Sequence, residues 1–230
     1  MIQNQAHLLY RLAQRHTFPM GEFAPLMSWL ASGERAQARL LDLGGEAPSF
    51  EVDQPNTSPY SIGRYDERRP ALYQTELFTG GEAPRCVHMG LDLGAPEGEP
   101  VYAWASGEVY ALGALPQPGD YGHSLVTRHS ITLQTEDIEP TLVTVWTLYG
   151  HLSARSITLR GVGERFVVGA RLGELGSPAE NGGWTPHLHF QLSVSAPEGH
   201  DLPGAVSDQE REAARKRYPD PRLIVGGLYK

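Results

Sequence analysis

Three short pieces of the chain contain the residue types that bind metal ions and move protons. They are His88-Met-Gly-Leu-Asp92, Tyr149-Gly-His151-Leu152 and His187-Leu-His189-Phe190, and together they hold four of the nine histidines. A catalytic zinc ion takes three protein ligands from His, Asp or Glu and leaves a fourth position for water. Two histidines and one carboxylate meet that requirement, and the remaining histidines can transfer protons near neutral pH.

The spacing of the last piece predicts a strand with one polar face. His187 and His189 are two residues apart, so a strand directs both imidazoles to one face, whereas a helix separates them by about 200°. The alternating Leu188, Phe190 and Leu192 supply a buried reverse face.

The first piece follows a different spacing. His88 and Asp92 are four residues apart, which gives a common face in a strand or in a helix, and Gly90 between them disfavours a helix. Spacing alone leaves open which of three later histidines bind the metal: His151, His187 and His189.

The segment that carries these pieces is rich in short strand-like runs. Between Glu82 and Val194 the runs are bounded by Gly and Pro, of which the whole chain has 26 and 18. Such spacing predicts an all-β core, as a sandwich or a barrel. The expected strands are Pro100–Ala103, Gly107–Leu112, Ser124–His129, Ile131–Gln134, Thr141–Leu148, Arg165–Val168, Leu172–Leu175 and His187–Val194.

The flanking segments divide the chain into three parts. Residues 1–80 are expected to form a helical and loop extension, residues 81–196 the β domain, and residues 197–230 a C-terminal helix and tail. Within the extension, apolar residues at helical spacing predict helices over 2–16 and 23–30, and Gly44–Pro70 has the composition of a loop. In the last part, Ser207 is expected to cap a helix over Asp208–Lys216, followed by an extended tail over Pro219–Lys230.

Composition limits the partners of the chain. Its 230 residues carry 19 Lys plus Arg against 27 Asp plus Glu, a formal charge of -8, which disfavours binding to a phosphate backbone. We therefore expect no nucleic-acid partner. No apolar run is long enough to cross a membrane, and no signal peptide is evident. These features predict a cytoplasmic protein, with export by another route left open, and they carry no signal about oligomeric state.

The single cysteine has two interpretations. Because Cys86 is alone, it forms no intrachain disulfide, which fits a reducing compartment. It lies two residues before His88, so in a strand its thiolate could face a metal as a fourth or regulatory ligand. The alternative is a small buried thiol.

The three pieces, in this order, resemble the lysostaphin and LytM-type zinc metallopeptidases. That family has a His-x-Gly-x-Asp strand, a Tyr-x-His-Leu segment and a His-Leu-His-Phe strand, and each pattern occurs here. Supporting matches are Gly94-Ala-Pro96, Pro100-Val-Tyr-Ala103, Gly107-Glu-Val109, Asp120-Tyr-Gly122 and Leu172-Gly-Glu-Leu-Gly176.

The resemblance implies a fold, a site and an activity. The fold is a duplicated hybrid motif with a groove over an antiparallel sheet. His88, Asp92 and His189 would hold zinc, and His151 and His187 would form the catalytic pair. The activity is cleavage of an amide bond in a peptidoglycan-type, glycyl or D-amino-acid peptide. Family members also carry groove-lining loops where this chain has Pro116–Gly119 and Gln134–Pro140.

Other interpretations of the sequence stay open. A weaker likeness, in Asn181–Leu192 and Tyr218–Arg222, is to a subgroup also found fused to pyridoxal-phosphate aminotransferases. The main alternative function is a catalytically idle, metal-containing binding module that regulates a cytoplasmic partner. A phosphocarrier-like or lipoyl-like β domain ranks last, because those domains lack a metal-binding His-x-x-x-Asp pattern. Four aromatic residues fit either a substrate wall or the core: Trp104, Tyr121, Tyr149 and Trp184.

Overall fold

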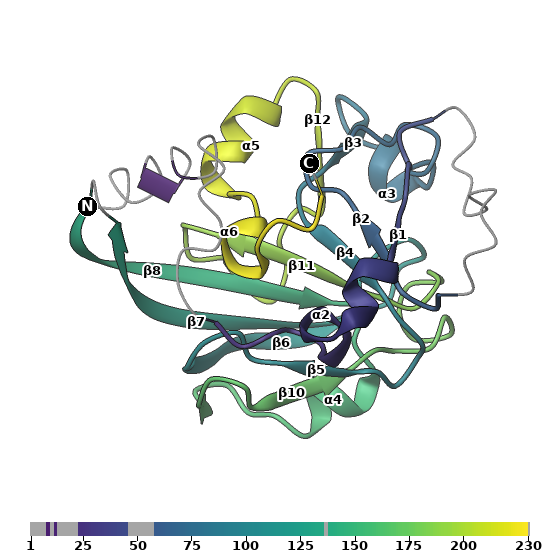
Figure 1. The fold of residues 1–230 in the computed structure, drawn as a ribbon. Helices are drawn as coiled ribbons and strands as arrows, with labels where there is room; N and C mark the ends of the chain where they lie inside the picture. Colours follow the sequence, from purple (N-terminus) through teal and green to yellow (C-terminus); the bar gives the residue numbers. More distant parts are fainter. Residues whose placement is uncertain (1–7, 10–11, 13–22, 46–57, 136–137, 230) are drawn as a thin grey trace.

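A large mixed sheet organises the molecule (Figure 1). The computed structural model describes residues 8–9, 12, 23–45, 58–135 and 138–229. In this part of the chain eight strands pair in the order β1-β2-β4-β11-β8-β7-β6-β9, and two further pairs, β10-β5 and β12-β3, lie outside the sheet. The strands are β1 (Arg39–Leu40), β2 (Ser61–Gly63), β3 (Arg85–His88), β4 (Leu91–Gly94), β5 (Pro100–Tyr102), β6 (Gly107–Leu115), β7 (Gly122–Thr135), β8 (Ile138–Gly150), β9 (Arg165–Phe166), β10 (Arg171–Glu174), β11 (His187–Ser193) and β12 (Ala205–Ser207).

The expected all-β core is confirmed, with one change to the expected sheet. β1 pairs with β2 in parallel, while the other neighbours in the sheet are antiparallel. The runs expected as two strands, Ser124–His129 and Ile131–Gln134, form one continuous β7. β7 and β8 make a long hairpin that extends to the left in Figure 1.

Alternation along β11 separates a core face from a polar face. Leu188, Phe190 and Leu192 are at most 1% exposed and belong to the main hydrophobic cluster, as their spacing predicts. The same cluster takes residues from β7, β8, β5 and β10 and from the short helices α2 (Ser28–Ala31) and α6 (Arg222–Val225). The histidines of β11 therefore face away from the main core.

A second cluster packs on the other side of the sheet. It joins Val126 and Leu148 of the long hairpin to Val87, Val206 and Ala214, which lie on β3, β12 and α5 (Arg211–Arg217). Figure 1 shows α5 above the long hairpin. Because this second layer covers only part of the sheet, the polar face of β11 stays accessible beside it.

Two short helices and a 3₁₀ turn complete the described elements. They are α3 (Glu76–Thr79), α4 (Ala154–Thr158) and the turn η1 (Gly33–Gln37). Ser153 caps α4 by accepting a hydrogen bond from the backbone N–H of Ser156 at 3.2 Å. No helix in the described ranges combines the length and the hydropathy that crossing a membrane requires.

Several local expectations are wrong. Within Gly44–Pro70, predicted as a loop, residues Ser61–Gly63 form β2, because pairing with β4 overrides a composition rich in turn formers. The tail predicted as extended contains α6, and the C-terminal helix starts at Arg211 instead of Asp208. The helix predicted over 23–30 is only the four residues of α2.

Two other expectations fall partly or wholly outside what the structure tests. The helix predicted over 2–16 lies mostly outside the described residues. The three-part division at residues 80 and 196 stays a prediction. Strand pairing nevertheless links the first two parts, since β2 joins the same sheet as β4.

A buried histidine outside the three histidine-rich pieces packs against the main core. His129 is fully buried, and its ring centroid is 4.3 Å from that of Trp104. Its Nδ1 donates to the carbonyl of Ser106 at 3.1 Å, and the hydroxyl of Thr127 donates to Nε2 at 2.7 Å. Burial lowers the pKa of His129 to about 4. The folded protein therefore keeps this ring neutral.

The neutral His129 predicts a loss of stability in acid. Between about pH 6.5 and pH 4 the unfolded chain binds a proton at this position and the folded chain does not, so stability falls as pH falls through that window. His129→Gln keeps a donor for Ser106 but does not titrate. We expect it to reduce the drop in unfolding free energy between pH 7 and pH 5 by about 2 kcal/mol.

Urea denaturation of the metal-free protein at both pH values measures this effect. The unsubstituted protein is the reference. An equal drop in His129→Gln and in the unsubstituted protein would contradict the assignment.

Candidate metal centre

The sheet register brings the first and third histidine-rich pieces together. Asp92 on β4 is the direct partner of His189 on the antiparallel β11, so the two side chains point to the same face. His88 lies at the end of β3, which belongs to a different sheet. The single strand implied by the His-x-Gly-x-Asp pattern is therefore two strands, with a break at Met89 and Gly90.

Three side chains converge on one point. The Oδ1 atom of Asp92 is 3.1 Å from His88 Nε2 and 3.1 Å from His189 Nδ1, and these two nitrogens are 3.1 Å apart. In the described part of the chain this is a group of three side chains whose ligand atoms all lie within 4.8 Å of one another. Zinc bonds of about 2.0–2.1 Å in a tetrahedron separate neighbouring ligand atoms by about 3.3 Å. The spacing thus fits a small divalent cation.

Hydrogen bonds on the outer ring nitrogens fix which atoms face this point. His88 Nδ1 donates to the carbonyl of Arg64 at 2.8 Å. The amide nitrogen of Gln191 donates to Pro203 at 3.3 Å, which leaves its oxygen to accept from His189 Nε2 at 3.0 Å. Each inner nitrogen consequently carries a lone pair. Two lone pairs and a carboxylate oxygen facing one another repel unless a cation lies between them, which is the donor set that a zinc ion needs.

A glycine makes room for this arrangement. A Cβ atom added at Gly90 would lie 2.5 Å from Cε1 and 2.6 Å from Nε2 of His189. The neighbouring atoms belong to a buried ring held on both sides, so they have no room to shift. The lack of room for a Cβ atom thus accounts for the glycine at position 90 of the first piece, in addition to the effect of glycine on helix formation.

A buried arginine holds the other oxygen of the carboxylate. Arg69 is 1% exposed, and its Nη1 donates to Asp92 Oδ2 at 2.6 Å while its Nε donates to Glu67 at 2.8 Å. Its Nη2 donates to the carbonyl of Arg64 at 3.1 Å, the same oxygen that receives His88. The guanidinium therefore ties Asp92 and His88 to one backbone segment.

Electrostatics keep Asp92 and His88 in their metal-binding states. Burial opposes ionisation of Asp92, but His88 and Arg69 hold its pKa well below the usual range. Burial lowers the pKa of His88 to about 4, and the charge of Arg69 acts in the same direction. At neutral pH the site thus offers a carboxylate and a neutral imidazole.

Two further histidines lie beside this cluster. His151 is 5% exposed, and its ring centroid is 4.3 Å from that of His187. Nε2 of His187 is 3.7 Å from Asp92 Oδ1. Nδ1 of His151 donates to the carbonyl of Asn181 at 2.8 Å, and Nδ1 of His187 to that of Thr185 at 2.7 Å. Both Nε2 atoms are therefore free to accept a proton.

The backbone at His151 has a conformation that L-residues rarely adopt. Its φ is 62°, in the left-handed region. The surrounding structure imposes this: its N–H donates to Tyr121 at 3.1 Å, and its carbonyl accepts from Gly176 at 2.9 Å. Burial and the neighbouring His187 and His189 hold the pKa of His151 well below its usual value, and burial also lowers the pKa of His187. Both rings are neutral at pH 7.

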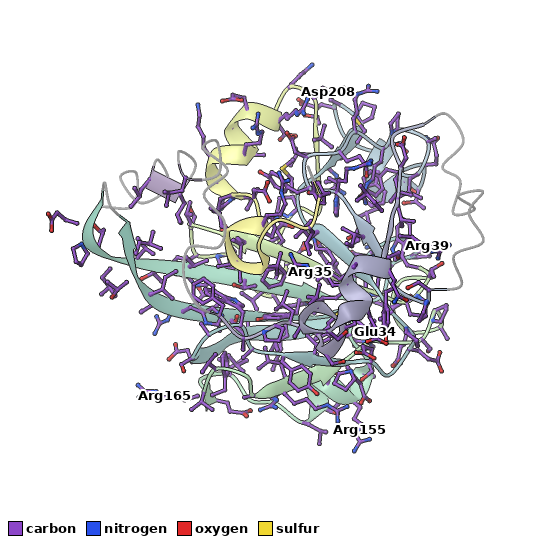
Figure 2. The ribbon with its side chains drawn as sticks, in the orientation of Figure 1. Glu34, Arg35, Arg39, Arg155, Arg165 and Asp208 are labelled. Atoms are coloured by element: carbon purple, nitrogen blue, oxygen red, sulfur yellow. The ribbon has the colours of Figure 1, made fainter. Side chains whose placement is uncertain are left out.

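The histidines open into a pocket of about 190 Å³. Its walls come partly from residues far away in sequence, including Leu41 beside β1, and Tyr73 and Phe78 near α3. Figure 2 shows one wall residue, Arg39, extending from β1 at the right-hand side of the view.

The structure brings together all five residues singled out from the sequence: His88, Asp92, His151, His187 and His189. Tyr121 and Trp184 line the pocket, whereas Trp104 and Tyr149 are core residues. Cys86 is a buried thiol 3.7 Å from a carboxylate oxygen of Asp208, outside the three-residue cluster.

Of the two insertions expected to line the groove, one contributes. Gly119 lines the pocket. The other insertion lies at the far tip of the β7–β8 hairpin, with residues 136–137 outside the described part of the chain. Ile138 and Gly150, at the two ends of β8, are separated by roughly 40 Å of strand.

Sequence reasoning missed Arg69 and Gln191. Gln191 was accessible to the same argument as the histidines, because it lies two residues beyond His189 on the same face of β11. Arg69 gave no local signal, since it reaches Asp92 from 23 residues away in a segment interpreted as a loop.

Comparison with known families and proteins gives consistent matches. The sequence profile described as "Peptidase family M23" matches residues 86–200. The chain is 30% identical over 144 residues to the DD-carboxypeptidase/endopeptidase Mpg of Neisseria meningitidis serogroup B (strain ATCC 13091 / M2091), and equally to that of Neisseria gonorrhoeae. Each alignment covers 60% of this chain and 29% of the relative, so the chain spans less than a third of these proteins.

Solved structures give more distant matches. The catalytic domain of lysostaphin from Staphylococcus simulans is 20% identical, with a TM-score of 0.41, over 68% of this chain and 92% of that domain. A zinc-containing peptidase from Vibrio cholerae is 22% identical, with a TM-score of 0.40, over 80% of this chain and 40% of that protein.

The space at Gly90 predicts the effect of a single methyl group. Gly90→Ala should displace the His189 ring and lower the affinity for zinc by about 10- to 100-fold, as a misplaced ligand does. Gly161→Ala adds the same methyl group where no atom lies within 4 Å, and should leave the affinity unchanged. Competition with a chromogenic chelator measures both. Equal affinities in the two variants, with equal melting temperatures, would disprove the steric argument.

The ion pair of Arg69 predicts a second loss of affinity. Arg69→Lys keeps the positive charge but cannot bond to Asp92, Glu67 and the carbonyl of Arg64 together. Zinc affinity should fall by about 10-fold or more, with a lower melting temperature in the metal-free protein. Arg165→Lys, on the exposed edge strand β9, is the matched control. Unchanged zinc affinity in Arg69→Lys would show that the guanidinium does not orient the carboxylate.

Proposed function

The chain belongs to peptidase family M23, and on that premise we propose that it is a zinc-dependent peptidase. Its hydrolysis of a peptide bond would take place in the pocket above His151 and His187. The observation that carries the proposal is the convergence of two imidazole lone pairs and one carboxylate oxygen at mutual distances of 3.1 Å. No side chain in that cluster donates a hydrogen bond into it.

The residues that would hold the ion are His88, Asp92 and His189. Zinc at such a site supplies a Lewis acid that polarises a substrate carbonyl and lowers the pKa of water. Two imidazoles and one carboxylate suit zinc better than the all-oxygen environment that magnesium or calcium prefers. The outer hydrogen bonds to Arg64 and Gln191 support this assignment, because they orient both imidazoles before any ion binds.

The second pair of histidines would handle protons. The fixed tautomer of His151, with Nδ1 donating to Asn181, leaves Nε2 ready to take a proton from the attacking water. His187 has the same tautomer, so its Nε2 offers a second place for the proton taken from that water, from which the proton can be donated to the leaving amine. Their lowered pKa values keep both rings neutral and able to accept at neutral pH.

The substrate class we propose is a peptidoglycan-type peptide with glycyl or D-amino-acid residues. Its support is the name of the Neisseria relatives, DD-carboxypeptidase/endopeptidase. A pocket bordered by Trp184 and Phe78 is suited to small, uncharged side chains beside the scissile bond.

A catalytically idle binding module is the second candidate. Segments outside the matched region do form part of the pocket wall, as that interpretation requires, but none of the described residues fills the space in front of His151 and His187. The open pocket favours the peptidase.

Substitution of the histidines separates the proposed roles. His151→Ala and His187→Ala should retain stoichiometric zinc and lose at least about 100-fold in kcat, since general acid–base catalysis contributes about 10²–10⁴-fold. His189→Ala should lose both zinc and activity. The measurements are metal content by mass spectrometry and hydrolysis of glycyl and D-alanyl peptides, with and without a chelator. His200→Ala is the control. Full zinc occupancy in His189→Ala would refute the ligand assignment.

A further inference from the structure

An arginine with an unsatisfied nitrogen lines the pocket at a distance from the proposed metal site. The Nε atom of Arg39 is buried, and it has no hydrogen-bond partner among the described residues. A buried guanidinium nitrogen left unpaired costs free energy, so its retention at a pocket wall indicates a ligand. The functional roles assigned above make no use of this side chain.

The sheet register places Arg39 in line with a proposed catalytic histidine. Arg39 pairs with Ser61, Ser61 with Gly94, and Gly94 with His187. Side chains in one such row across a sheet share a face, so Arg39 and His187 border the same surface from opposite ends. Leu41, two residues on from Arg39, also lines the pocket, as the alternation requires.

The sheet surface between Arg39 and His187 carries only small side chains. Gly94 has no side chain, and a Cβ atom there would lie 2.1 Å from Oγ of Ser61, so the serine hydroxyl covers that position. Nothing larger than a hydroxymethyl group in this row separates His187 from Arg39. A peptide that leaves the proposed site across the row would reach Arg39 without obstruction.

The other arginines of the pocket are already engaged. Arg69 is paired with Asp92 and Glu67. Arg85 donates to the carbonyl of Leu77, and its guanidinium lies 5.4 Å from the ring centroid of Phe78. Among the arginines that line the pocket in the described part of the chain, Arg39 is therefore the one with a buried nitrogen left for a ligand.

The charged side chains are distributed unevenly along the pocket. Asp120, two residues before β7, and Asp201 line one end together with Arg85, whereas Arg39 lies on the edge strand β1. Two carboxylates outnumber one guanidinium at the first end, so a negatively charged group is favoured at the second. The ligand of Arg39 is thus an anion, and in a peptidase substrate the available anion is a carboxylate.

We propose that Arg39 binds a substrate carboxylate located one or two residues beyond the scissile bond. The proposal rests on the proposed peptidase function. Three strand spacings separate Arg39 from His187, about 14 Å between Cα atoms, and part of this gap is spanned by the arginine side chain. The remainder accommodates about two residues of extended peptide, at roughly 3.5 Å each. The carboxylate is either the free C-terminus of the peptide or an acidic side chain at that place.

Three peptides distinguish these sources. They are acetyl-pentaglycine with a free carboxylate, the same peptide as its C-terminal amide, and an amide whose last residue is glutamate. We expect the zinc-loaded protein to prefer the two carboxylate peptides by about 10- to 100-fold in kcat/KM, chiefly through KM. A preference for the first alone assigns the free terminus, and a preference for the third alone assigns the side chain.

The variant test uses a matched pair. Arg39→Gln should lose the preference for carboxylate peptides, so that the three peptides have similar values of kcat/KM. Arg165→Gln removes the same charge on β9, at the opposite edge of the sheet, and should keep the preference. Figure 2 labels both arginines, well apart in the view. A preference that survives in Arg39→Gln would overturn the proposal.

Binding measured without turnover keeps the two proposals separate. Calorimetric titration of the chelator-treated protein with the free and amidated peptides should show tighter binding of the free form, lost in Arg39→Gln. If no peptide is hydrolysed but this difference appears, the peptidase function fails and the carboxylate site stands. If hydrolysis is chelator-sensitive and neither readout distinguishes carboxylate from amide, the carboxylate site is refuted and the peptidase function stands.

Discussion

The structure of the candidate site depends on one buried carboxylate. Asp92 faces two imidazole nitrogens with one oxygen and the guanidinium of Arg69 with the other. Desolvation alone would favour its neutral form, but the surrounding charges keep it ionised. Each oxygen of Asp92 faces defined partners. The carboxylate on β4 therefore orients His88 of β3, His189 of β11 and Arg69 of the segment before β3.

Around that carboxylate, the protein controls histidine chemistry mainly through backbone carbonyls. His88, His151 and His187 each donate Nδ1–H to a carbonyl, of Arg64, Asn181 and Thr185 respectively, while His189 uses the side chain of Gln191. One ring nitrogen of each histidine consequently donates to this outer partner, and the other nitrogen faces the candidate site. Burial keeps three of these rings neutral, with lowered pKa values for His88, His151 and His187, so the same arrangement suits both metal binding and proton transfer.

The segment before the matched region completes the site. β1 and β2 extend the sheet beyond β4, and Arg69 enters the space above Gly63, where a Cβ atom would lie 2.9 Å from its Nη2. Arg39 and Leu41 then form the outer wall of the pocket. The five histidine and aspartate residues of the candidate site therefore come from the matched region, and much of the surface that would select a substrate comes from outside it.

By itself the sequence determined the fold class, the strand that begins at His187, the family and the five residues of the candidate site. The strand follows from a two-residue period, which fixes the side chains that share a face, whereas the family and the five residues follow from the resemblance of three short motifs to a known family. It could not determine β2 or α6, where long-range pairing and packing override composition. Nor could it find Arg69 or Arg39, because their roles depend on distances between segments that only the folded sheet brings together. Register decided those contacts, since a shift by one residue would turn Asp92 or Arg39 to the other face of the sheet.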